Sequence, residues 1–281
     1  MDAGAPITAP PELAFDDAGN LWCFFGTGKF FGQSDKTDAA EQYLYGIKDT
    51  AWGYSNGEWG YSPSAGEVTN IKDVTNITVS ADMADYICMC EGGQVNLCSD
   101  NQPAKRQDAS GDLICGCGNL VVTEVKNVTV NNCNGHTGWE DCVNYITTNY
   151  DGWKRDLDTN APTERDISKP AVVGQIAMFT TFKPNSDVCG LGGDSYLYSL
   201  YYKAGIPYKQ PSILLNTAFQ NNQIKAGVYI GQGAPAIGES ITTKQVGSQT
   251  KTYIQLSTGQ VVEMNQKPVY LPNKTQFWIE E

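Results

Sequence analysis

The sequence predicts an all-β fold in which about three four-stranded blades of a β-propeller carry a cysteine-rich, β-containing insertion. Three observations support this prediction. One apolar pattern occurs three times along the 281 residues. The 29 Gly and 15 Tyr residues, with abundant Val and Thr, suit short strands joined by turns. Helical periodicity is weak everywhere, with at most one turn expected at Thr37–Gln42, capped by Thr37 or Asp38.

The first copy of the pattern begins with a proline-led apolar strand, Pro11–Phe15. Proline is tolerated at the first residue of a strand, because its missing N–H need not join the ladder. The turn residues Asp16–Asn20 then close a hairpin with Leu21–Gly26. Tyr43–Ile47 supplies a third strand, and we expect the chain to return to this blade at Gly152–Leu157.

The second and third copies repeat this order of apolar runs. They are Pro170–Gly174, Ile176–Phe182 and Tyr196–Leu200, then Pro235–Gly238, Thr252–Leu256 and Gln260–Met264. Ile176–Phe182 is apolar at nearly every position, as expected for a strand buried on both faces between stacked sheets. A repeat of roughly 40 to 50 residues built from short strands is typical of propeller blades. We therefore expect adjacent four-stranded antiparallel blades at 10–49, 169–215 and 235–264.

Three blades do not close a propeller, which typically needs about four to eight. An open arc leaves two blade faces uncovered, and we expect apolar residues on both. Met1–Pro6 has neither the charged nor the apolar region of a secretory signal peptide. We interpret the chain as the C-terminal part of a longer protein, or one half of a two-chain protein, whose N-terminal part supplies the missing blades. Expressed alone, it should aggregate or stay partly molten.

Charge and hydropathy exclude several classes of protein. The net charge is −12, so the basic surface that binds nucleic acid or anionic membranes is missing. No window approaches the roughly 18 consecutive apolar residues of a transmembrane helix. An acidic surface of this kind is either simply solvated or able to attract Ca²⁺.

Nine cysteines indicate a disulfide-rich segment. Seven of them lie between residues 88 and 142, which predicts a disulfide-stapled insertion in an oxidising compartment and a metal site in the cytosol. We place the insertion at 55–150 and expect it to project from the blade. Cys23 lies inside an apolar strand and is expected to be a buried free thiol. The disulfide candidates are Cys88, Cys90, Cys98, Cys115, Cys117, Cys133, Cys142 and Cys189.

Two C-x-C segments lie within the insertion. Residues i and i+2 of a strand share a face, so Cys88–Cys90 and Cys115–Cys117 on two antiparallel strands could bring four sulfur atoms together. Such a square could hold Zn²⁺ or form two disulfides, and the spacing is tighter than structural zinc sites prefer, which favours disulfides. Cys133 and Cys142 are expected to pair around a short loop that contains His136.

Candidate metal ligands are few. Asp156, Asp158 and Asn160 have the spacing of the first ligands of a calcium loop. However, Ala161 replaces the glycine of the sharp turn, and Ile167 replaces the closing glutamate. The pattern is therefore an incomplete calcium site. A second, looser acidic group consists of Ser34, Asp35 and Asp38.

Motifs for catalysis are also incomplete. Gly26–Lys29 is similar to a phosphate-binding loop, but that loop opens a helix, whereas Phe30 and Phe31 here follow a strand. We interpret it as a strand-end turn. His136 is the only histidine, so no Ser-His-Asp or Cys-His system can form without it, and we expect it at the surface. No C-x-x-C-H segment for haem attachment is present.

Several segments, in order and at matching spacing, resemble the PilY family of type IV pilus proteins. They cover roughly two-thirds of the chain, leaving 55–150 as an insertion between blades at 1–54 and 151–281. The segments are LWCFFGTGKFF at 21–31, QYLYGIKD at 42–49, the run from Gly152 through FTTFKPNSDVC at 179–189, GGDSYLYSL at 192–200, STGQ at 257–260 and FWIE at 277–280.

The resemblance implies a secreted, surface-exposed propeller at the tip of a type IV pilus that acts in pilus assembly, twitching motility and adhesion. The implied partners are the remaining N-terminal part of the propeller, minor pilins, and a host or abiotic surface. Family members often carry a calcium loop that modulates pilus retraction. No good copy of that loop is found in this sequence, so the sequence neither predicts nor excludes Ca²⁺ as a cofactor.

We therefore expect a non-catalytic, extracellular pilus-tip adhesin and assembly or retraction factor rather than an enzyme. The alternative is a propeller enzyme, quinoprotein-like or hydrolytic, or a carbohydrate-binding propeller. Tyr-Leu-Tyr-Ser-Leu segments also occur in quinoprotein propellers, but vicinal cysteines are absent from the sequence, so shared architecture explains that similarity. A quinone absorbance spectrum of the purified protein would instead favour the enzyme.

Overall fold

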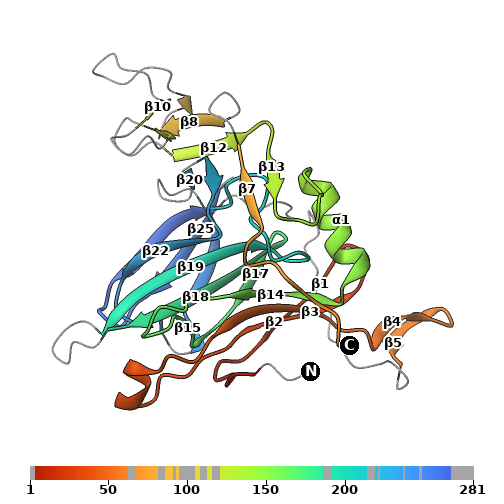
Figure 1. The fold of residues 1–281 in the computed structure, drawn as a ribbon, viewed down its shortest axis with the longest axis horizontal. Helices are drawn as coiled ribbons and strands as arrows, with labels where there is room; N and C mark the ends of the chain where they lie inside the picture. The colour runs from red at the N-terminus through yellow and green to blue at the C-terminus, as the bar shows by residue number, and fades with distance from the viewer. Residues whose placement is uncertain are drawn as a thin grey trace.

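The computed structural model describes residues 4–62, 68–81, 86–90, 93–94, 105–107, 113–115, 121–185, 192–213, 219–220, 222–236, 238–246 and 249–266. Of residues 82–124, only the backbone of the strands is described. Strands dominate, and the prediction of an all-β fold is confirmed. Three main sheets follow one another through the body of the molecule, and none closes on itself (Figure 1).

The first sheet has the strand order β1-β2-β3-β14-β6. The predicted return of the chain to this sheet is confirmed, because β14 pairs antiparallel with β3. β6 adds a parallel edge strand that the sequence does not predict, since three residues are too few to show a period. The strands are β1 (Glu12–Phe15), β2 (Leu21–Gly26), β3 (Tyr43–Lys48), β14 (Gly152–Asp156) and β6 (Ile71–Asp73).

Asp16 organises the predicted turn between β1 and β2. Its Oδ1 accepts the backbone N–H groups of Ala18 at 2.9 Å and Asn20 at 2.8 Å, and its Oδ2 accepts Nε1–H of Trp22 at 3.1 Å. Gly19 has φ +83°, the left-handed conformation that glycine adopts without strain. The turn is therefore fixed by side-chain hydrogen bonds as well as by its backbone.

The second sheet has the order β15-β18-β19-β22, and β17 also pairs with β18. The strand predicted at Ile176–Phe182 is confirmed. The predicted extent of this blade, 169–215, is wrong, because the fourth strand, β22, follows turns at 202–213 that bury Tyr202 and Ile206 in the core. The strands are β15 (Arg165–Asp166), β17 (Ala171–Val173), β18 (Ile176–Pro184), β19 (Gly193–Tyr201) and β22 (Gly227–Gln232).

The third sheet contains β24 (Ile241–Val246), β25 (Gln249–Gln255) and β26 (Val261–Gln266). The prediction of four strands at 235–264 is wrong for the described residues. Pro235 forms only an isolated bridge to Leu256, because proline offers no N–H to a ladder. The chain then pairs as β23 (Gly238–Glu239), in parallel with β16 (Ser168–Lys169).

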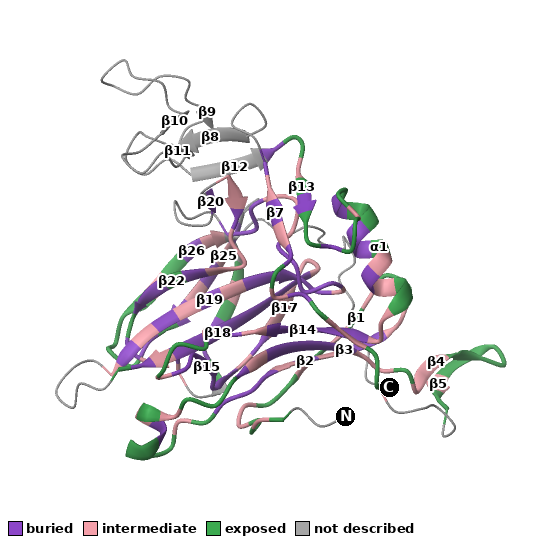
Figure 2. Ribbon diagram, in the orientation of Figure 1, coloured by how far each residue is buried: buried purple, intermediate pink, exposed green. Residues whose placement is uncertain are grey.

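The second sheet lies between the other two, and its central strand β18 is buried on both faces (Figure 2). Along β18, Ala177 and Phe179 pack in a core with Trp153 of the first sheet. Ile176 and Met178 point the opposite way, into a core shared with the third sheet. All four β18 side chains are 0% exposed, which explains the continuous apolar run. Consecutive propeller blades also pack face to face in this way.

The expected projection of segment 55–150 is found only in part, because residues 74–81 and 125–146 pack against the first sheet whereas the hairpin at 52–61 extends from its end (Figure 1). Val79, Val130 and Ile146 lie in the same core as Trp22 and Trp153. The division into an insertion at 55–150 and blades at 1–54 and 151–281 stays a prediction. The strands of this region and its partners are β4 (Trp52–Ser55), β5 (Glu58–Tyr61), β7 (Thr78–Ser80), β8 (Tyr86–Cys90), β9 (Gly93–Gln94), β10 (Lys105–Gln107), β11 (Leu113–Cys115), β12 (Val121–Val125), β13 (Thr129–Asn131), β20 (Phe219–Gln220) and β21 (Gln223–Ile224).

Two short helical elements differ from the prediction. α1 (Trp139–Asn149) buries Trp139, Cys142, Val143 and Ile146 along one face. This i, i+3, i+4, i+7 spacing is the pattern of an amphipathic helix, so the expectation of weak helical periodicity everywhere is wrong for this segment. The expected turn at 37–42 is instead a 3₁₀-helix, η1 (Gln33–Thr37). No helix in the described part of the chain is long and apolar enough to cross a membrane.

Candidate functional site

One face of the first sheet points away from the second sheet and carries apolar side chains. Side chains alternate along each strand, and the pairing of β1 with β2 and of β2 with β3 sets these residues beside one another. Phe25 and Tyr45 stack across the ladder at 5.0 Å between ring centroids. We call this surface the outer face. Its members are Leu13, Phe15, Leu21, Cys23, Phe25, Tyr43, Tyr45 and Ile47.

The outer face is exposed along β1 and becomes buried toward β3. Leu13 and Phe15 on β1 are 58% and 60% exposed. Cys23 and Phe25 on β2 are half-buried, and Ile47 on β3 is buried. Apolar area left in water forgoes about 25 cal/mol per Å² of stabilisation. A surface of this kind therefore favours contact with another apolar surface.

The corresponding face of the third sheet is mainly polar. Strand alternation and register point Thr242, Lys244, Gln255 and Glu263 outward together with Tyr253 and Val261, and Lys251 pairs with Glu263 across β25 and β26. The prediction that both uncovered faces are apolar is therefore wrong for this end. A sheet with one polar face can end a stack in water. The two ends of the stack thus differ in chemistry.

Cys23 lies near the middle of the outer face and is a free cysteine. It is half-buried rather than fully buried as expected. Burial, helped by the negative charge of Asp49, raises the pKa of the Cys23 thiol. The thiol is therefore protonated and slow to react at neutral pH.

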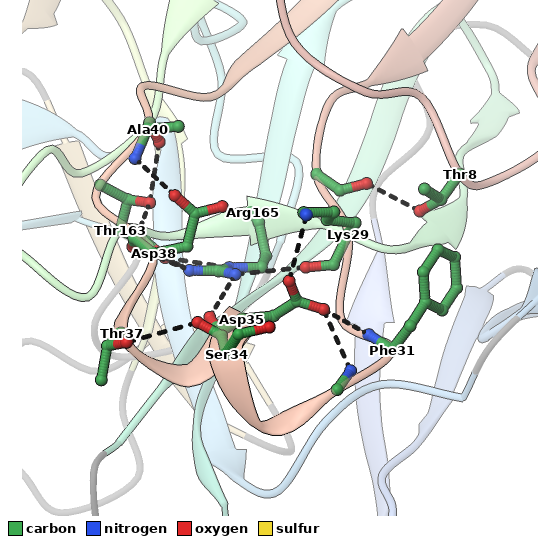
Figure 3. Close-up of polar contacts among 12 residues, drawn as sticks. Thr8, Lys29, Phe31, Ser34, Asp35, Thr37, Asp38, Ala40, Thr163 and Arg165 are labelled. Carbon is green, nitrogen blue, oxygen red and sulfur yellow. Dashed lines mark hydrogen bonds and ion pairs between the residues drawn. The ribbon is translucent and has the colours of Figure 1, made fainter.

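Arg165 holds the loop between β2 and β3 in place (Figure 3). Its side chain is only 1% exposed. The guanidinium donates to the backbone carbonyls of Asp35 at 2.7 Å, Lys29 at 3.2 Å and Asp38 at 3.3 Å, and twice to that of Thr163 at 3.0 and 3.2 Å. Burial lowers the pKa of Arg165. One buried cation thus organises a polar loop that lies beside the outer face.

Asp35 and Asp38, which the sequence suggests as an acidic group, stabilise this loop separately. Asp35 Oδ2 accepts the backbone N–H groups of Phe31 at 2.8 Å and Gly32 at 3.0 Å, and Oδ1 lies 3.4 Å from Lys29 Nζ. The N–H of Phe31 is the main cause that lowers the pKa of Asp35. Asp38 accepts a backbone N–H two residues further on, at 3.0 Å. The two carboxylates do not converge on one ligand.

Glu164 and Asp166 are buried between the first and second sheets, on either side of Arg165 in the sequence. Glu164 accepts hydrogen bonds from the hydroxyls of Thr181 and, at 3.2 Å, Tyr198. Burial raises the pKa of Glu164. This carboxyl is therefore satisfied by hydroxyl groups rather than by a cation.

Asp166 is the less satisfied of the two. Its Oδ1 accepts the N–H of Ser168 at 3.2 Å, while its Oδ2 is buried with no hydrogen-bond partner among the described residues. Gly26 fits closely against it, because a Cβ there would lie 2.2 Å from Oδ2. Burial raises the pKa of Asp166 to about 8. The carboxyl is therefore mostly protonated at neutral pH.

The calcium candidates Asp156, Asp158 and Asn160 are not brought together around a common point. Asp156 lies 3.2 Å from Lys154, and Asp158 lies 2.5 Å from Lys183. Asn160 donates its backbone N–H and its amide to Asp158 Oδ1, at 2.9 and 2.6 Å. Ammonium groups thus neutralise both carboxylates. Within the described ranges, no three His, Cys, Asp or Glu side chains cluster as metal ligands would.

The structure joins Cys133 and Cys142, the pair expected from the sequence. His136 lies in the loop that they close, with Nδ1 2.8 Å from Asp141 Oδ2 and its ring stacked on Tyr145 at 4.6 Å. The two C-x-C segments were expected on neighbouring antiparallel strands. In the described backbone, the strand with Cys88 and Cys90, β8, pairs with β9 and β12, whereas the strand with Cys115, β11, pairs with β10. The side chains of the other candidates lie outside the described residues, namely Cys88, Cys90, Cys98, Cys115, Cys117 and Cys189.

Gly26–Lys29 is a strand-end turn with no free N–H cradle for a phosphate. Thr27 N–H donates to Tyr43 O at 2.8 Å, and Gly28 N–H donates to Pro6 O at 2.7 Å. The carbonyl of Thr27 accepts the N–H of Asp166 at 2.9 Å. The turn therefore connects the first sheet to β15 of the second.

Two features of the site were not predicted. The buried Glu164-Arg165-Asp166 run gives no sequence signal, because its environment is made by distant segments. The exposed aromatic residues of the hairpin β4–β5 had a signal, since Asn56-Gly57 between alternating apolar residues is a strong indication of a hairpin.

No protein-family model matches the chain, and no curated protein matches it. Among solved structures, the crystal structure of the Pseudomonas aeruginosa PilY1 C-terminal domain matches with a TM-score of 0.50 and 19% sequence identity. The match covers 93% of this chain. The chain has the fold of the PilY1 C-terminal domain. It spans 45% of the PilY1 chain, so less than half of that structure has a counterpart here. The resemblance to PilY proteins predicted from sequence motifs is thus confirmed at the level of the fold.

Proposed function

We propose that this chain is a non-enzymatic interaction module of a PilY-like type IV pilus protein, and that its outer face docks a further β-sheet of the same assembly. The observation that carries the proposal is the difference between the two ends of the stack. The outer face of the first sheet carries Leu13, Phe15 and Phe25, whereas the outward face of the third sheet carries mainly lysine, threonine and glutamate side chains, with Val261 as an exposed apolar residue. The first sheet is therefore the end that favours a partner.

The fold comparison supports this choice of partner. More than half of the PilY1 structure lies beyond the part that matches this chain, so a related assembly has additional polypeptide available to cover the outer face. A sheet is the occupant we commit to, because a flat apolar sheet face is best covered by another sheet about 10 Å away.

In this proposal the protein acts outside the cell, at the tip of the pilus, in pilus assembly or retraction and in adhesion. Its partners are the rest of the propeller, minor pilins and the surface that the pilus contacts. The disulfide between Cys133 and Cys142 agrees with an oxidising compartment. The net charge of −12 gives no support to nucleic acid as a partner.

Two matched substitutions test the proposal in the organism that encodes the chain. Leu13 and Val261 are each 58% exposed, and they lie on edge strands at opposite ends of the stack. Leu13→Asp places a charge in the docking surface and should reduce surface pili and twitching motility, whereas Val261→Asp should leave both unchanged. Equal effects of the two variants at normal protein level, or normal piliation with Leu13→Asp, would contradict the proposal.

A further inference from the structure

The hairpin β4–β5 presents aromatic side chains on one of its faces. Trp52 lies opposite Tyr61, and Tyr54 lies opposite Trp59, so all four share one side of the ladder. Phe15 of β1 adds a fifth ring, 5.7 Å from Trp52. Figure 1 shows the hairpin extending from the end of the first sheet. We call the surface formed by Phe15, Trp52, Tyr54, Trp59 and Tyr61 the aromatic platform.

The aromatic platform is held rigidly by the turn that precedes β2. Trp52 Nε1–H donates to the carbonyl of Gly19 at 3.1 Å. Trp59 lies so close to Gly19 that a Cβ at that position would be 2.3 Å from its ring. The two indoles are nearly parallel, at 12° and 6.3 Å. Because Asp16 fixes the same turn, the rings are in place before any ligand arrives, which lowers the entropic cost of binding.

The platform is also unusually exposed. Phe15 is 60%, Tyr54 63%, Trp59 46% and Tyr61 63% exposed. Single exposed aromatic residues are common on protein surfaces, but a contiguous group of this size marks an interaction site. The rigid support distinguishes this group from a loose apolar hairpin.

Charge narrows the chemistry of the ligand. The hairpin carries no lysine or arginine between residues 49 and 62, and its own ionisable side chains are Asp49 and Glu58. Glu58 lies on the other side of the ladder, but Asp16 belongs to the turn on which Trp52 and Trp59 pack, so an anionic ligand would meet a carboxylate beside the platform. Nucleic acid, anionic lipid and acidic polysaccharide therefore fit this surface poorly.

A neutral sugar chain fits it well. The C–H groups on the flat face of a pyranose ring carry a small positive charge and stack on the negative face of an aromatic ring. The Tyr54 and Tyr61 hydroxyls can hydrogen-bond sugar hydroxyls. Beside Phe15 the surface continues into a pocket that offers further polar groups. That pocket is lined by Ala14, Phe15, Asp16, Asp17, Val172, Gly174, Gln175 and Tyr202.

We propose that the aromatic platform binds neutral polysaccharide by stacking pyranose rings on Trp59 and its neighbours. This inference rests on the proposed function in one respect, because an adhesive module needs a ligand, but it concerns a neighbouring surface that shares only Phe15 with the outer face. The outer face docks protein, and the platform contacts a glycan.

The test measures binding of the native protein to immobilised hexaoses of glucose, mannose and N-acetylglucosamine. We expect binding to at least one of them, weakened about tenfold by Trp59→Ala or Tyr61→Ala, which corresponds to about 1.4 kcal/mol for the loss of one ring contact. Tyr229→Ala is the matched control, because Tyr229 is 49% exposed on the second sheet, and it should bind like the wild type. The Tyr61 side chain is exposed enough that its loss should preserve the fold, which circular dichroism checks.

Three outcomes would overturn the inference: no binding to any neutral hexaose, equal binding by wild type and both platform variants, or binding only to an acidic polysaccharide or a proline-rich peptide. The proposed function can fail separately. Glycan binding by the wild type that Trp59→Ala abolishes, together with normal surface pili in Leu13→Asp, refutes the proposed function alone. Absent glycan binding, together with a loss of pili in Leu13→Asp, refutes the inference alone.

Discussion

Asp166→Asn should make the stability of this protein less sensitive to rising pH. The Asp166 carboxyl is 0% exposed and one of its oxygens has no hydrogen-bond partner among the described residues. Its pKa is about 8 in the folded protein, against an ordinary value of 3.8. Because the folded pKa is the higher one, the stability that the protonated carboxyl contributes is fully present below about pH 4. It is lost as the pH rises through about 8.

The size of the effect follows from these two values. They differ by about 4, and each pKa unit corresponds to about 1.4 kcal/mol, so the upper limit is about 6 kcal/mol. Relaxation and water entry reduce the cost of a buried charge, and we expect about 2 to 4 kcal/mol. Glu164 shifts in the same direction and remains in the variant, so some pH dependence should persist.

The assay is urea unfolding of the native protein by pulse proteolysis, followed on peptides from 152–184, between about pH 5 and pH 9. Across this range the wild-type midpoint should fall from pH 5 to about pH 8 and level off above it, and the Asp166→Asn midpoint should fall less and exceed it near pH 9. Glu58→Gln removes an exposed carboxylate and should leave the wild-type profile unchanged. A wild-type midpoint that stays constant or rises with pH, or parallel profiles for wild type and Asp166→Asn, would refute the reasoning.

Three further predictions concern the supports of the site. Arg165→Met leaves the carbonyls of residues 29–38 without their donor and should lower the free energy of unfolding in urea by about 2 to 4 kcal/mol. The control Lys209→Met removes an exposed ion pair with Glu140 and should lower it by less than about 1 kcal/mol. Gly19→Ala is strained at φ +83° and collides with Trp59, so hydrogen exchange in 52–61 should accelerate; unchanged exchange would show that the turn does not support the hairpin. Cys142→Ser opens a loop with a sequence separation of 9 and should lower stability by about 2 to 3 kcal/mol, and no change in the urea midpoint would contradict a structural role for this disulfide.

The strands could be predicted where one simple period dominates. Ile176–Phe182 is apolar at almost every position, and both of its faces are buried. The same reasoning could not predict β22, because the turns at 202–213 separate it from its neighbour β19, nor β6, which pairs in parallel with a strand about 80 residues away. The strand predicted to begin at Pro235 was wrong, because a proline-led apolar segment can equally well form a single β-bridge.

The candidate site was predictable only in part. Alternation along the strands implies which side chains share a face, but the partner strand and its register decide whether that face is apolar or polar. The third sheet shows this, since Ile254 and Met264 point inward while Lys251 and Glu263 point out. Buried ionisable groups were beyond prediction, because the carbonyls that bind Arg165 belong mainly to residues more than 120 positions earlier.

The docking role of the outer face is tested most directly by the alkylation rate of Cys23, which lies on that face. The native assembly is treated with iodoacetamide near pH 8.5, where thiol reactivity is measurable, and the peptide that contains Cys23 is quantified by mass spectrometry against a urea-denatured reference. If a further sheet covers the outer face, the wild-type and Val261→Asp proteins should react at least about tenfold more slowly than Leu13→Asp, in which the contact is weakened. Equal alkylation rates in all three proteins would show that nothing docks on this face.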